Sequence, residues 1–414
     1  MTKGKNTLLG VTRRDTLALG AGFGASLTLA AAGVGSAQAQ ATGTPIRIGG
    51  TLALTGPLAQ TGAIHKVVGD LFVEQINKNG GMMGRPVEWI LLDDQSKPDL
   101  ARTLYERLIT VDKVDLLIGP YATANILSAM SVAQRFNKML VHHTFGIPKL
   151  ATYDKHFPAW PLGAEPEKTV NANLFDGLAS TGKTPKSIAI VTSKFPSVNF
   201  IAVGARETAK QRGIEEKLFL EYEFGNRDYG PIAARIREAN ADLLYVGAIG
   251  LEGSQLLEAL DQLNYKPKNH YYVYPTPGPL ASSPLGGDAM AATAYEDLAP
   301  LNSSPAAQTF SKLFHEAAAK AKLPYLEPDT QAGTSYSAWQ TIAAAVNGTK
   351  SLDDQVLADY LKKNGADTII GKFRFDGVNN YGPDLMKVKQ VQNGVWTIVW
   401  PKEFATAGKP IIIK

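Results

Sequence analysis

The sequence predicts an α/β protein of two Rossmann-like lobes, each built on a parallel sheet. Short β-branched runs alternate with amphipathic stretches from Ile46 onward, which is the pattern of parallel strands joined by helices. This alternation occurs twice, and a helix-rich segment then precedes the last strand-like runs. About 375 residues follow the N-terminal segment, more than one hydrophobic core usually organises. We therefore expect two lobes that face a cleft.

The first lobe is predicted from four strand-like runs separated by three helices. The first helix has one apolar face, because Val67, Val68, Leu71 and Phe72 recur at three-to-four-residue spacing. Thr123 is expected to cap the third helix. The predicted strands are residues 46–54, 87–92, 116–118 and 139–141, and the helices are residues 63–79, 98–112 and 123–136.

The second lobe is predicted from a further set that begins after the Pro-rich passage at residues 157–161. Its strands are residues 187–192, 218–223, 243–247 and 270–274, and its helices are residues 198–212, 229–240 and 251–263. Helical stretches follow at residues 304–322, 331–347 and 352–364, and strand-like runs follow at residues 372–375, 386–392 and 395–400.

Residues 1–39 have the pattern of an export signal. Arg13 and Arg14 precede an apolar run rich in Ala and Gly, and small residues end the segment. Paired arginines indicate the twin-arginine route, although Thr16 stands where such signals usually carry a bulky apolar residue. The apolar run is shorter than the ~20 residues that span a membrane, so we expect removal rather than anchoring. The mature protein is expected to be periplasmic, soluble and not lipidated.

Charge and cysteine content exclude several classes of function. The chain carries +4, and residues 1–39 hold four basic and one acidic residue (+3), which leaves +1 for the mature part. This near-neutral balance, without any basic run, gives no reason to expect nucleic acid or an anionic membrane as a partner. The chain has no cysteine, so it has no disulfide, no thiol nucleophile and no thiolate metal site.

Polar residues gather where three strands of the first lobe end. The loop at residues 54–62 contains Thr61 and opens a helix, but no lysine follows its second glycine as in a nucleotide-phosphate loop. An ordinary strand-to-helix turn is the alternative for that loop. The next two strand ends hold Tyr121 with Thr123, and Thr144 with Gly146. Because parallel strands end at one edge of a sheet, we expect a site there for a small polar or anionic ligand.

No constellation predicts catalysis, a metal or a cofactor. His142 and His143 are adjacent in a strand and point to opposite sides, so we expect no metal site. Asp93 and Asp94 diverge likewise and are expected to form hydrogen bonds within a loop. No serine has a G-x-S-x-G context, and Tyr121 alone is placed in the cleft among the aromatic residues. The aromatic residues expected in the core or at an interface are Tyr271, Tyr272, Tyr274, Trp339, Trp396 and Trp400.

Several of these stretches carry a resemblance that spans essentially the whole mature chain. The Gly-Gly turn within residues 74–84 and the Asp-Asp strand end at residues 92–94 are the specific part. The other matching stretches are residues 48–62, 117–120, 245–247 and 368–371. On these residues the chain resembles the type I periplasmic solute-binding proteins of the leucine/isoleucine/valine-binding family, the receptor subunits of ABC importers.

The resemblance implies a hinge of three crossing strands between the lobes, which closes about solute. The closed form would be the one that the membrane permease recognises. The implied division is residues 44–163 plus 299–376 for lobe 1, and residues 164–298 plus 377–414 for lobe 2. The crossings are expected near residues 162–165, 297–300 and 375–383.

The resemblance also implies where the first lobe binds its ligand. Thr123 matches the hydroxyl residue that holds a ligand carboxylate together with loop amides. Thr144 and Gly146 match the next loop, where the family often has a hydroxyl at the second position and glycine leaves only its amide. The family's disulfide would join the positions of Ser96 and Ala122, so both of its halves are missing.

On the second lobe the resemblance implies a changed ligand. Ser197 and Ile249 fall where aromatic residues are usual, and Thr276 falls where an acid normally meets the α-ammonium group. Without that acid, neutral donors favour a carboxylate that lacks an α-amino group, such as an aromatic or short aliphatic acid. Phe145 would help to line an apolar pocket. Glu165, near the family's hinge acid, is the one acid left for an ammonium, so leucine or valine stays open.

We therefore expect a non-enzymatic, monomeric binding protein that needs no cofactor and delivers a small solute to an ABC permease in the inner membrane. Two other classes stay open, an exported enzyme that uses the same cleft and a cytoplasmic ligand-sensing regulator of the same fold. The export signal and the missing DNA-binding head argue against the regulator. The missing nucleophile–base pair, metal set and nucleotide loop argue against the enzyme.

Overall fold

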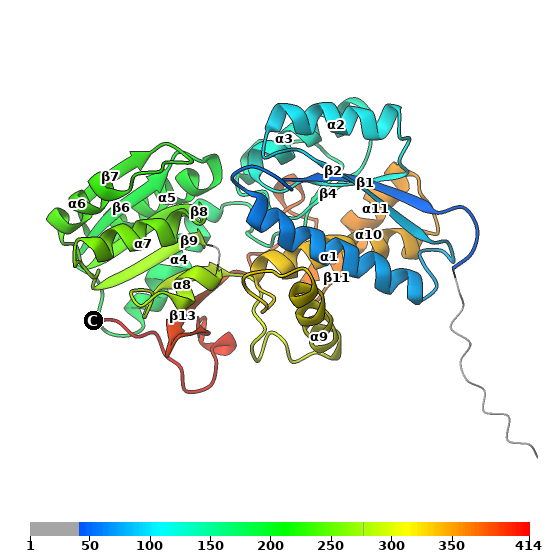
Figure 1. Cartoon of the computed structure of the whole chain (residues 1–414). Helices are drawn as coiled ribbons and strands as arrows, with labels where there is room; N and C mark the ends of the chain where they lie inside the picture. The colour runs from blue at the N-terminus through cyan, green and yellow to red at the C-terminus, as the bar shows by residue number, and fades with distance from the viewer. Residues whose placement is uncertain (1–40, 276) are drawn as a thin grey trace, which may run out of the picture. The chain divides into compact units, whose positions relative to one another are not determined.

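The computed structural model describes residues 41–275 and 277–414, so the predicted export signal and Thr276 lie outside the described residues. The first of its two large sheets has five parallel strands in the order β2-β1-β3-β4-β5 (Figure 1). These strands are β1 (Ile46–Leu52), β2 (Val87–Asp93), β3 (Leu116–Ile118), β4 (Leu140–His142) and β5 (His156–Pro158).

The second sheet has seven strands in the order β14-β13-β10-β9-β8-β6-β7. Five of them are parallel: β6 (Ser187–Ser193), β7 (Glu215–Tyr222), β8 (Leu243–Gly250), β9 (Asn269–Pro275) and β10 (Met290–Thr293). The antiparallel strands β13 (Lys387–Gln392) and β14 (Val395–Trp400) complete one edge. A separate short pair joins β11 (Ala366–Asp367) to β12 (Lys372–Phe373).

The two sheets are wound in the same way. The order β7-β6-β8-β9-β10 repeats the order β2-β1-β3-β4-β5, so each sheet reverses its strand order after its first strand. In open α/β sheets, ligands bind beyond the carboxyl ends of the strands at such a reversal. The predicted α/β fold class is confirmed, with an antiparallel pair added at one edge of the second sheet.

Helices cover both sheets. Those packed with the first sheet are α1 (Ala59–Lys78), α2 (Pro98–Thr110), α3 (Thr123–Arg135), α9 (Pro305–Lys320), α10 (Thr330–Thr349) and α11 (Asp354–Asn364). Those packed with the second are α4 (Pro166–Ala179), α5 (Pro196–Gln211), α6 (Gly230–Ala239), α7 (Glu252–Gln262) and α8 (Pro277–Ser282). Among the described residues, no helix combines the length and apolar character that crossing a membrane requires.

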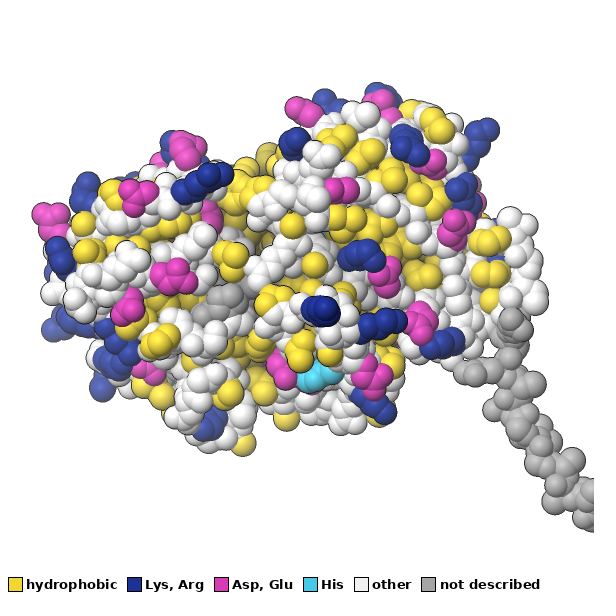
Figure 2. Space-filling model, in the orientation of Figure 1, with side chains coloured by type: hydrophobic (Ala, Val, Ile, Leu, Met, Phe, Trp, Pro, Cys, Tyr) yellow, Lys and Arg dark blue, Asp and Glu magenta, His cyan; other side chains and the backbone are white. Residues whose placement is uncertain are grey.

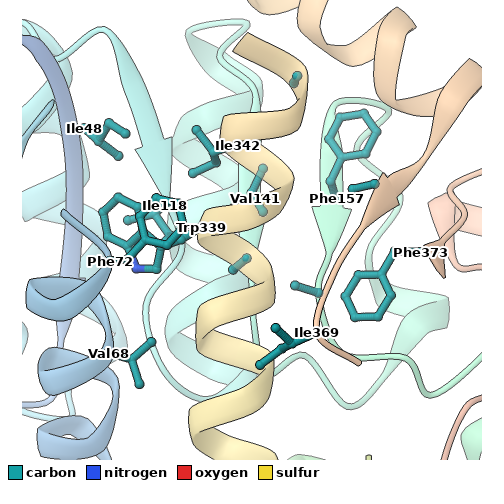
Figure 3. Close-up of a cluster of buried hydrophobic side chains, with 14 of the residues drawn as sticks. Ile48, Val68, Phe72, Ile118, Val141, Phe157, Trp339, Ile342, Ile369 and Phe373 are labelled. Atoms are coloured by element: carbon teal, nitrogen blue, oxygen red, sulfur yellow. The ribbon is translucent and has the colours of Figure 1, made fainter. Parts of the chain in front are cut away.

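Helix α10 is the centre of the core against the first sheet (Figure 3). Its side chains Trp339 and Ile342 lie between α1 and the strands, and the Trp339 ring stacks on Phe72 with centroids 5.6 Å apart. This helix is buried along most of its length, which explains its content of Ala, Gly, Ser and Thr. Asp329 caps it by accepting hydrogen bonds from the amides of Gln331 and Ala332.

Three differences from the predicted elements matter for the site. Strand β5, helix α4 and strand β10 were not predicted. Strand β5 gives a weak signal because it has only three residues and ends in Pro158. Thr123 was predicted to cap α3, but it is the first helical residue and Ala122 occupies the capping position. The Thr123 hydroxyl instead accepts a hydrogen bond from the Gly146 amide, a tertiary contact that local sequence does not reveal.

Candidate functional site

A pocket lies at the carboxyl ends of strands from both sheets. Its lining consists of Tyr121, Ala122, Thr144, Gly146, Trp160, Ser197, Ile249 and Tyr274. The first five follow β3, β4 and β5, and the other three come from α5, β8 and β9. Five of the ten predicted site residues are therefore brought together. The free space among them is about 10 Å³, enough for one water molecule, so a ligand enters only when the walls separate.

Two threonine hydroxyls connect the loops on the first-sheet side. The Thr144 hydroxyl accepts from the Ala122 amide at 3.1 Å, and the Thr123 hydroxyl accepts from the Gly146 amide at 3.1 Å. Each hydroxyl uses its oxygen in this contact and keeps its own hydrogen for donation. Ala122 has φ = 77°, an uncommon value for a side-chain-bearing residue, and this conformation turns its amide towards Thr144.

Two buried donors in the pocket have no hydrogen-bond partner. They are Trp160 Nε1 and the Tyr274 hydroxyl, and their rings meet edge to face with centroids 5.1 Å apart. Burial raises the pKa of Tyr274 well above its ordinary value, so the phenol remains a donor. Buried polar groups are almost always paired, so two orphan donors in one pocket indicate a place where a ligand supplies the acceptor.

Sequence reasoning missed both of these aromatic residues. Tyr274 was assigned to the core, and Trp160 was counted with the Pro-rich passage. Trp160 follows β5, so its place in the site depends on a strand that was not predicted. The sequence signal that could have identified Tyr274 as a site residue is its position at the end of a predicted strand.

Gly146 lets the two sides of the pocket approach closely. A Cβ atom at this position would lie 2.7 Å from the Cβ atom of Ser197, at the start of α5. Real Cβ atoms do not come that close, so any larger residue would push the loop after β4 away from α5. Glycine at this position is therefore required by tertiary contact.

The described lining carries no charged side chain. The buried acid Glu252 lies next to it at the end of β8 and accepts a hydrogen bond from the Ile249 amide at 3.2 Å. Burial raises the pKa of Glu252 to about 7, and its other carboxyl oxygen has no partner. Its carboxyl group therefore bonds to the backbone of a residue that lines the pocket.

Four predicted site residues lie outside the lining, and a fifth is outside the described residues. Glu165 was expected near the ligand; in this structure its side chain is 59% exposed and paired with Lys168, outside the lining. Phe145 is fully buried in the core beside His142 rather than in a pocket wall. Thr61 is buried in α1, where its hydroxyl contacts the Tyr121 side chain, and Thr123 lies behind Gly146. Thr276 is the residue that the structure does not describe.

Four buried histidines lie behind the pocket on the first-sheet side. The His65 ring stacks on His143 at 4.2 Å and contacts the Tyr121 ring at 5.1 Å. His142 Nε2 lies 2.9 Å from Nδ1 of His156. The adjacent histidines thus have separate partners, as their opposite directions predicted. Burial lowers the pKa of His143 to about 3 and that of His156 to about 4, and it lowers the pKa of the other two as well.

At the ends of β1 and β2, the polar groups described next form hydrogen bonds with one another. Asp93 accepts from the amides of Leu54, Thr55 and Gln95 at 2.8–3.2 Å. Burial would raise the pKa of Asp93, but these bonds and the Thr55 hydroxyl outweigh it and hold that pKa below its ordinary value. The predicted loop hydrogen bonding of Asp93 and Asp94 is confirmed. The amides of Leu54, Thr55 and Leu58 in the loop at residues 54–62 are thus paired, as in an ordinary strand-to-helix turn.

A wider, more open hollow lies beside the C-terminal segment, lined by residues 399–411 together with Ser180 and Thr181. It is a shallow surface feature, and it holds none of the strand-end donors described above. We place the candidate site at the smaller pocket because its buried polar groups converge there.

Comparisons with known proteins identify the family of the chain. The sequence profile of the periplasmic binding protein family matches residues 45–394. The Leu/Ile/Val-binding protein of Escherichia coli is 22% identical over 331 residues, which cover 78% of this chain and 84% of the relative. The resemblance that the sequence predicted is thereby confirmed.

Two solved structures share the fold. The branched-chain amino acid transporter substrate-binding protein of Streptococcus pneumoniae, in complex with isoleucine, has a TM-score of 0.72 at 18% identity, covering 86% of this chain and all (100%) of that one. An ABC transporter solute-binding protein of R. palustris, in complex with benzoate, has a TM-score of 0.73 at 18% identity, covering 89% and 99%. With the profile match over most of its length, the chain belongs to the periplasmic binding protein family.

Proposed function

We propose that this protein captures a small carboxylate in the pocket and presents it to the permease of an ABC importer. The observation that carries the proposal is the pair of buried, unpartnered donors, Trp160 Nε1 and the Tyr274 hydroxyl. A carboxylate offers about four lone-pair sites, so it can accept from both donors and from the Thr144 hydroxyl. Hydrogen bonds to a charged acceptor are also the strong ones.

The lack of a charged lining argues for a ligand without an α-ammonium group. Burying an ammonium without a carboxylate or several acceptors is strongly unfavourable. Glu165 is exposed and paired with Lys168, and Glu252 accepts a hydrogen bond from the Ile249 amide, so each acid already has a partner in this conformation. A true amino acid such as leucine or valine is the alternative, and it would require an acceptor from Thr276 or a rearranged acid.

The walls suit an apolar body. Ile249, Tyr121 and the rings of Trp160 and Tyr274 surround the donors with apolar surface. An aromatic or short aliphatic acid combines that body with one anionic end. The two similar structures, one with isoleucine and one with benzoate, show that the fold serves both classes. The pocket chemistry favours the second class here.

We also propose that residues 44–163 with 299–376, and residues 164–298 with 377–414, move as two lobes about the crossing segments. The equal winding of the two sheets supports this division. The first and third crossings already meet, since Leu162 bridges Asp384 and the Leu385 amide donates to the Pro161 carbonyl at 2.9 Å. Ligand should shrink the radius of gyration in small-angle scattering. An unchanged profile at saturation would argue against hinge closure.

Residues 1–39 would direct export of the protein, which would then act in the periplasm as a soluble, unlipidated and non-enzymatic monomer. Family membership supports a receptor rather than an enzyme. Replacing both arginines of the signal, Arg13→Lys with Arg14→Lys, should retain the precursor in the cytoplasm.

A thermal-shift screen tests the ligand class. Matched pairs such as leucine with 4-methylpentanoate, and phenylalanine with 3-phenylpropanoate, differ in the α-amino group alone. A ligand at 100 times its Kd stabilises by about 2.7 kcal/mol, which is easily seen as a rise in Tm. We expect the acids, benzoate included, to raise Tm and the amino acids not to do so. Stabilisation by leucine or valine without the acids would contradict the proposal.

Conservative variants then locate the ligand. Tyr274→Phe keeps the ring and Trp160→Phe keeps a smaller aromatic ring, and each removes one donor. Each should weaken the binding of an acid ligand about 10- to 100-fold, the loss of one hydrogen bond to a charged group. Tyr245→Phe is the matched control, because its hydroxyl bonds to Asn171 Oδ1 outside the pocket at 2.8 Å. Equal affinity in all three variants would place the ligand elsewhere.

A further inference from the structure

Away from the pocket, three side chains from different segments converge on the surface. Asp297 follows β10, His315 lies on α9, and Glu327 lies in the loop before α10. One ligand atom from each lies within 4.8 Å of the other two. His315 Nε2 is 3.2 Å from Asp297 Oδ2 and 2.8 Å from Glu327 Oε2. The other five histidines of the chain are at most 2% exposed, whereas the His315 side chain is 37% exposed. Figure 2 shows a histidine side chain at the surface beside acidic side chains.

A proton cannot satisfy this arrangement. Nε2 carries at most one hydrogen, in neutral or protonated imidazole, yet two carboxylate oxygens face it. The carboxylate oxygen that receives no hydrogen then faces the other carboxylate oxygen, and their like charges are close together. A divalent cation accepts all three atoms at once. Ligands held at ~2.0–2.2 Å around a tetrahedral ion lie roughly 3.4 Å apart. The two separations from His315 Nε2, 3.2 and 2.8 Å, are of this order.

The surroundings are those of a metal site. Asp297 is already oriented, since its Oδ1 accepts from Asn302 Nδ2 at 2.9 Å and its Oδ2 accepts from the Ser311 hydroxyl. Beside it lies a hollow lined by Asp297 and Glu327 and also by Glu296 and Tyr325, without a Lys or Arg in its described lining. The one basic group near Glu296, Lys389, is fully buried in its own ion pair with that acid. The hollow gives an ion access and room for water as a fourth ligand.

We propose that Asp297, His315 and Glu327 bind a divalent transition metal, with Zn²⁺ as the best match. One imidazole and two carboxylates suit Zn²⁺ and its neighbours in the first row, whereas Mg²⁺ and Ca²⁺ prefer all-oxygen sites. The ion would tie the segment after β10 to α9 and to the loop before α10. Sequence analysis predicted no metal site, because the three ligands are spread over 31 positions without a recognisable spacing.

Titration calorimetry on tag-free mature protein, stripped with EDTA, tests the site with ZnCl₂, MgCl₂ and CaCl₂. We expect one Zn²⁺ per chain and Mg²⁺ or Ca²⁺ at least about 100-fold weaker. Co²⁺ should give the visible absorption of a tetrahedral site. His315→Gln and Glu327→Gln should each weaken Zn²⁺ by more than about 10-fold, and Asn302→Ala by about 10-fold, as for other metal-orienting residues.

Glu316→Gln is the matched control, since it removes an exposed acid one residue from His315 without touching the three ligands. It should leave Zn²⁺ affinity within about twofold, as expected for an exposed charge outside the coordination shell. Both ligand residues tested are at least one-third exposed, so their variants should fold, and circular dichroism checks this. Absence of saturable Zn²⁺ binding, or equal affinity in His315→Gln and Glu327→Gln, would overturn the proposal.

Discussion

The first sheet ends in two different ways along one edge. At the ends of β1 and β2, Asp93 and Asp94 accept hydrogen bonds from the neighbouring loop, and Ser96 both donates and accepts there. At the ends of β3, β4 and β5, buried polar atoms of Trp160 and the histidine group have no partner. The first end is built from carboxylates and hydroxyls, and the second from histidine and tryptophan rings.

The difference separates a structural turn from a binding site. A strand end whose polar groups are all paired has nothing left to offer a ligand, and it contributes stability instead. A strand end with unpartnered buried donors lowers the stability of the ligand-free protein, and a ligand that supplies the acceptors removes this cost. Three predictions test this comparison.

The largest expected effect is acid destabilisation from the unpartnered end. Its four histidines are His65, His142, His143 and His156, and burial holds all their pKa values below 6.5. The folded state therefore resists protonation, so stability is complete above pH 6.5 and falls as the pH drops towards 4. The pKa values of about 3 for His143 and about 4 for His156 correspond to a loss of about 2 kcal/mol of stability for each between pH 7 and pH 5, and the lowered pKa values of His65 and His142 act in the same direction.

Urea unfolding at both pH values measures this loss. His143→Phe keeps a ring against His65 and removes one titrating group, so its pH-dependent loss should be smaller by about 2 kcal/mol. If the wild type is as stable at pH 5 as at pH 7, these histidines are not buried as described.

The second expected effect is at the paired end. Asp94→Ala removes the acceptor of the Thr51 hydroxyl at 2.7 Å and of the Ser96 amide at 3.0 Å. Two hydrogen bonds to a charged group are worth about 4 kcal/mol together, and that loss should appear in unfolding at pH 7. Asp99→Ala, an exposed acid nearby, is the control and should change stability by less than about 0.5 kcal/mol. Unchanged ligand affinity in Asp94→Ala would support the division between the two ends, and lost affinity in a folded variant would contradict it.

The smallest expected effect is on folding stability, which substitutions at two buried tyrosines should change in opposite directions. Tyr274→Phe removes an orphan donor and should raise the stability of the ligand-free protein by about 1 kcal/mol. Tyr245→Phe breaks the bond to Asn171 and should lower stability by about 1–2 kcal/mol. Thermal unfolding of both variants decides it, and a loss of stability in Tyr274→Phe would mean that its hydroxyl is already satisfied.

Local pattern was sufficient for most of the fold. Strand 116–118 and strand 395–400 were predicted to the residue, since each is a continuous apolar or alternating run between turn residues. The divergence of Asp93 and Asp94, and of His142 and His143, followed from strand geometry alone. Strand β5 could not be predicted in this way, because it exists only through pairing with β4.

The site was predictable on one side only. Tyr121, Thr144 and Gly146 follow strands of one sheet, so their meeting was a consequence of topology. Trp160 and Tyr274 meet through contact between segments 114 residues apart, for which the sequence has no local signal. The expected place of Glu165 came from the resemblance, whereas the pairing of its side chain with Lys168 is a property of this chain that the resemblance does not reveal.

Gly146 has a practical consequence for anyone who would turn this receptor into a reporter. The optical signal of such a device depends on how far the two walls of the pocket move when the analyte binds. Because the Ser197 side chain would meet the first added carbon at 2.7 Å, Ala, Val and Leu at position 146 form a graded series of spacers. Each larger side chain should hold the two walls further apart in the closed form, which reduces the change in signal on binding and weakens the affinity for the analyte.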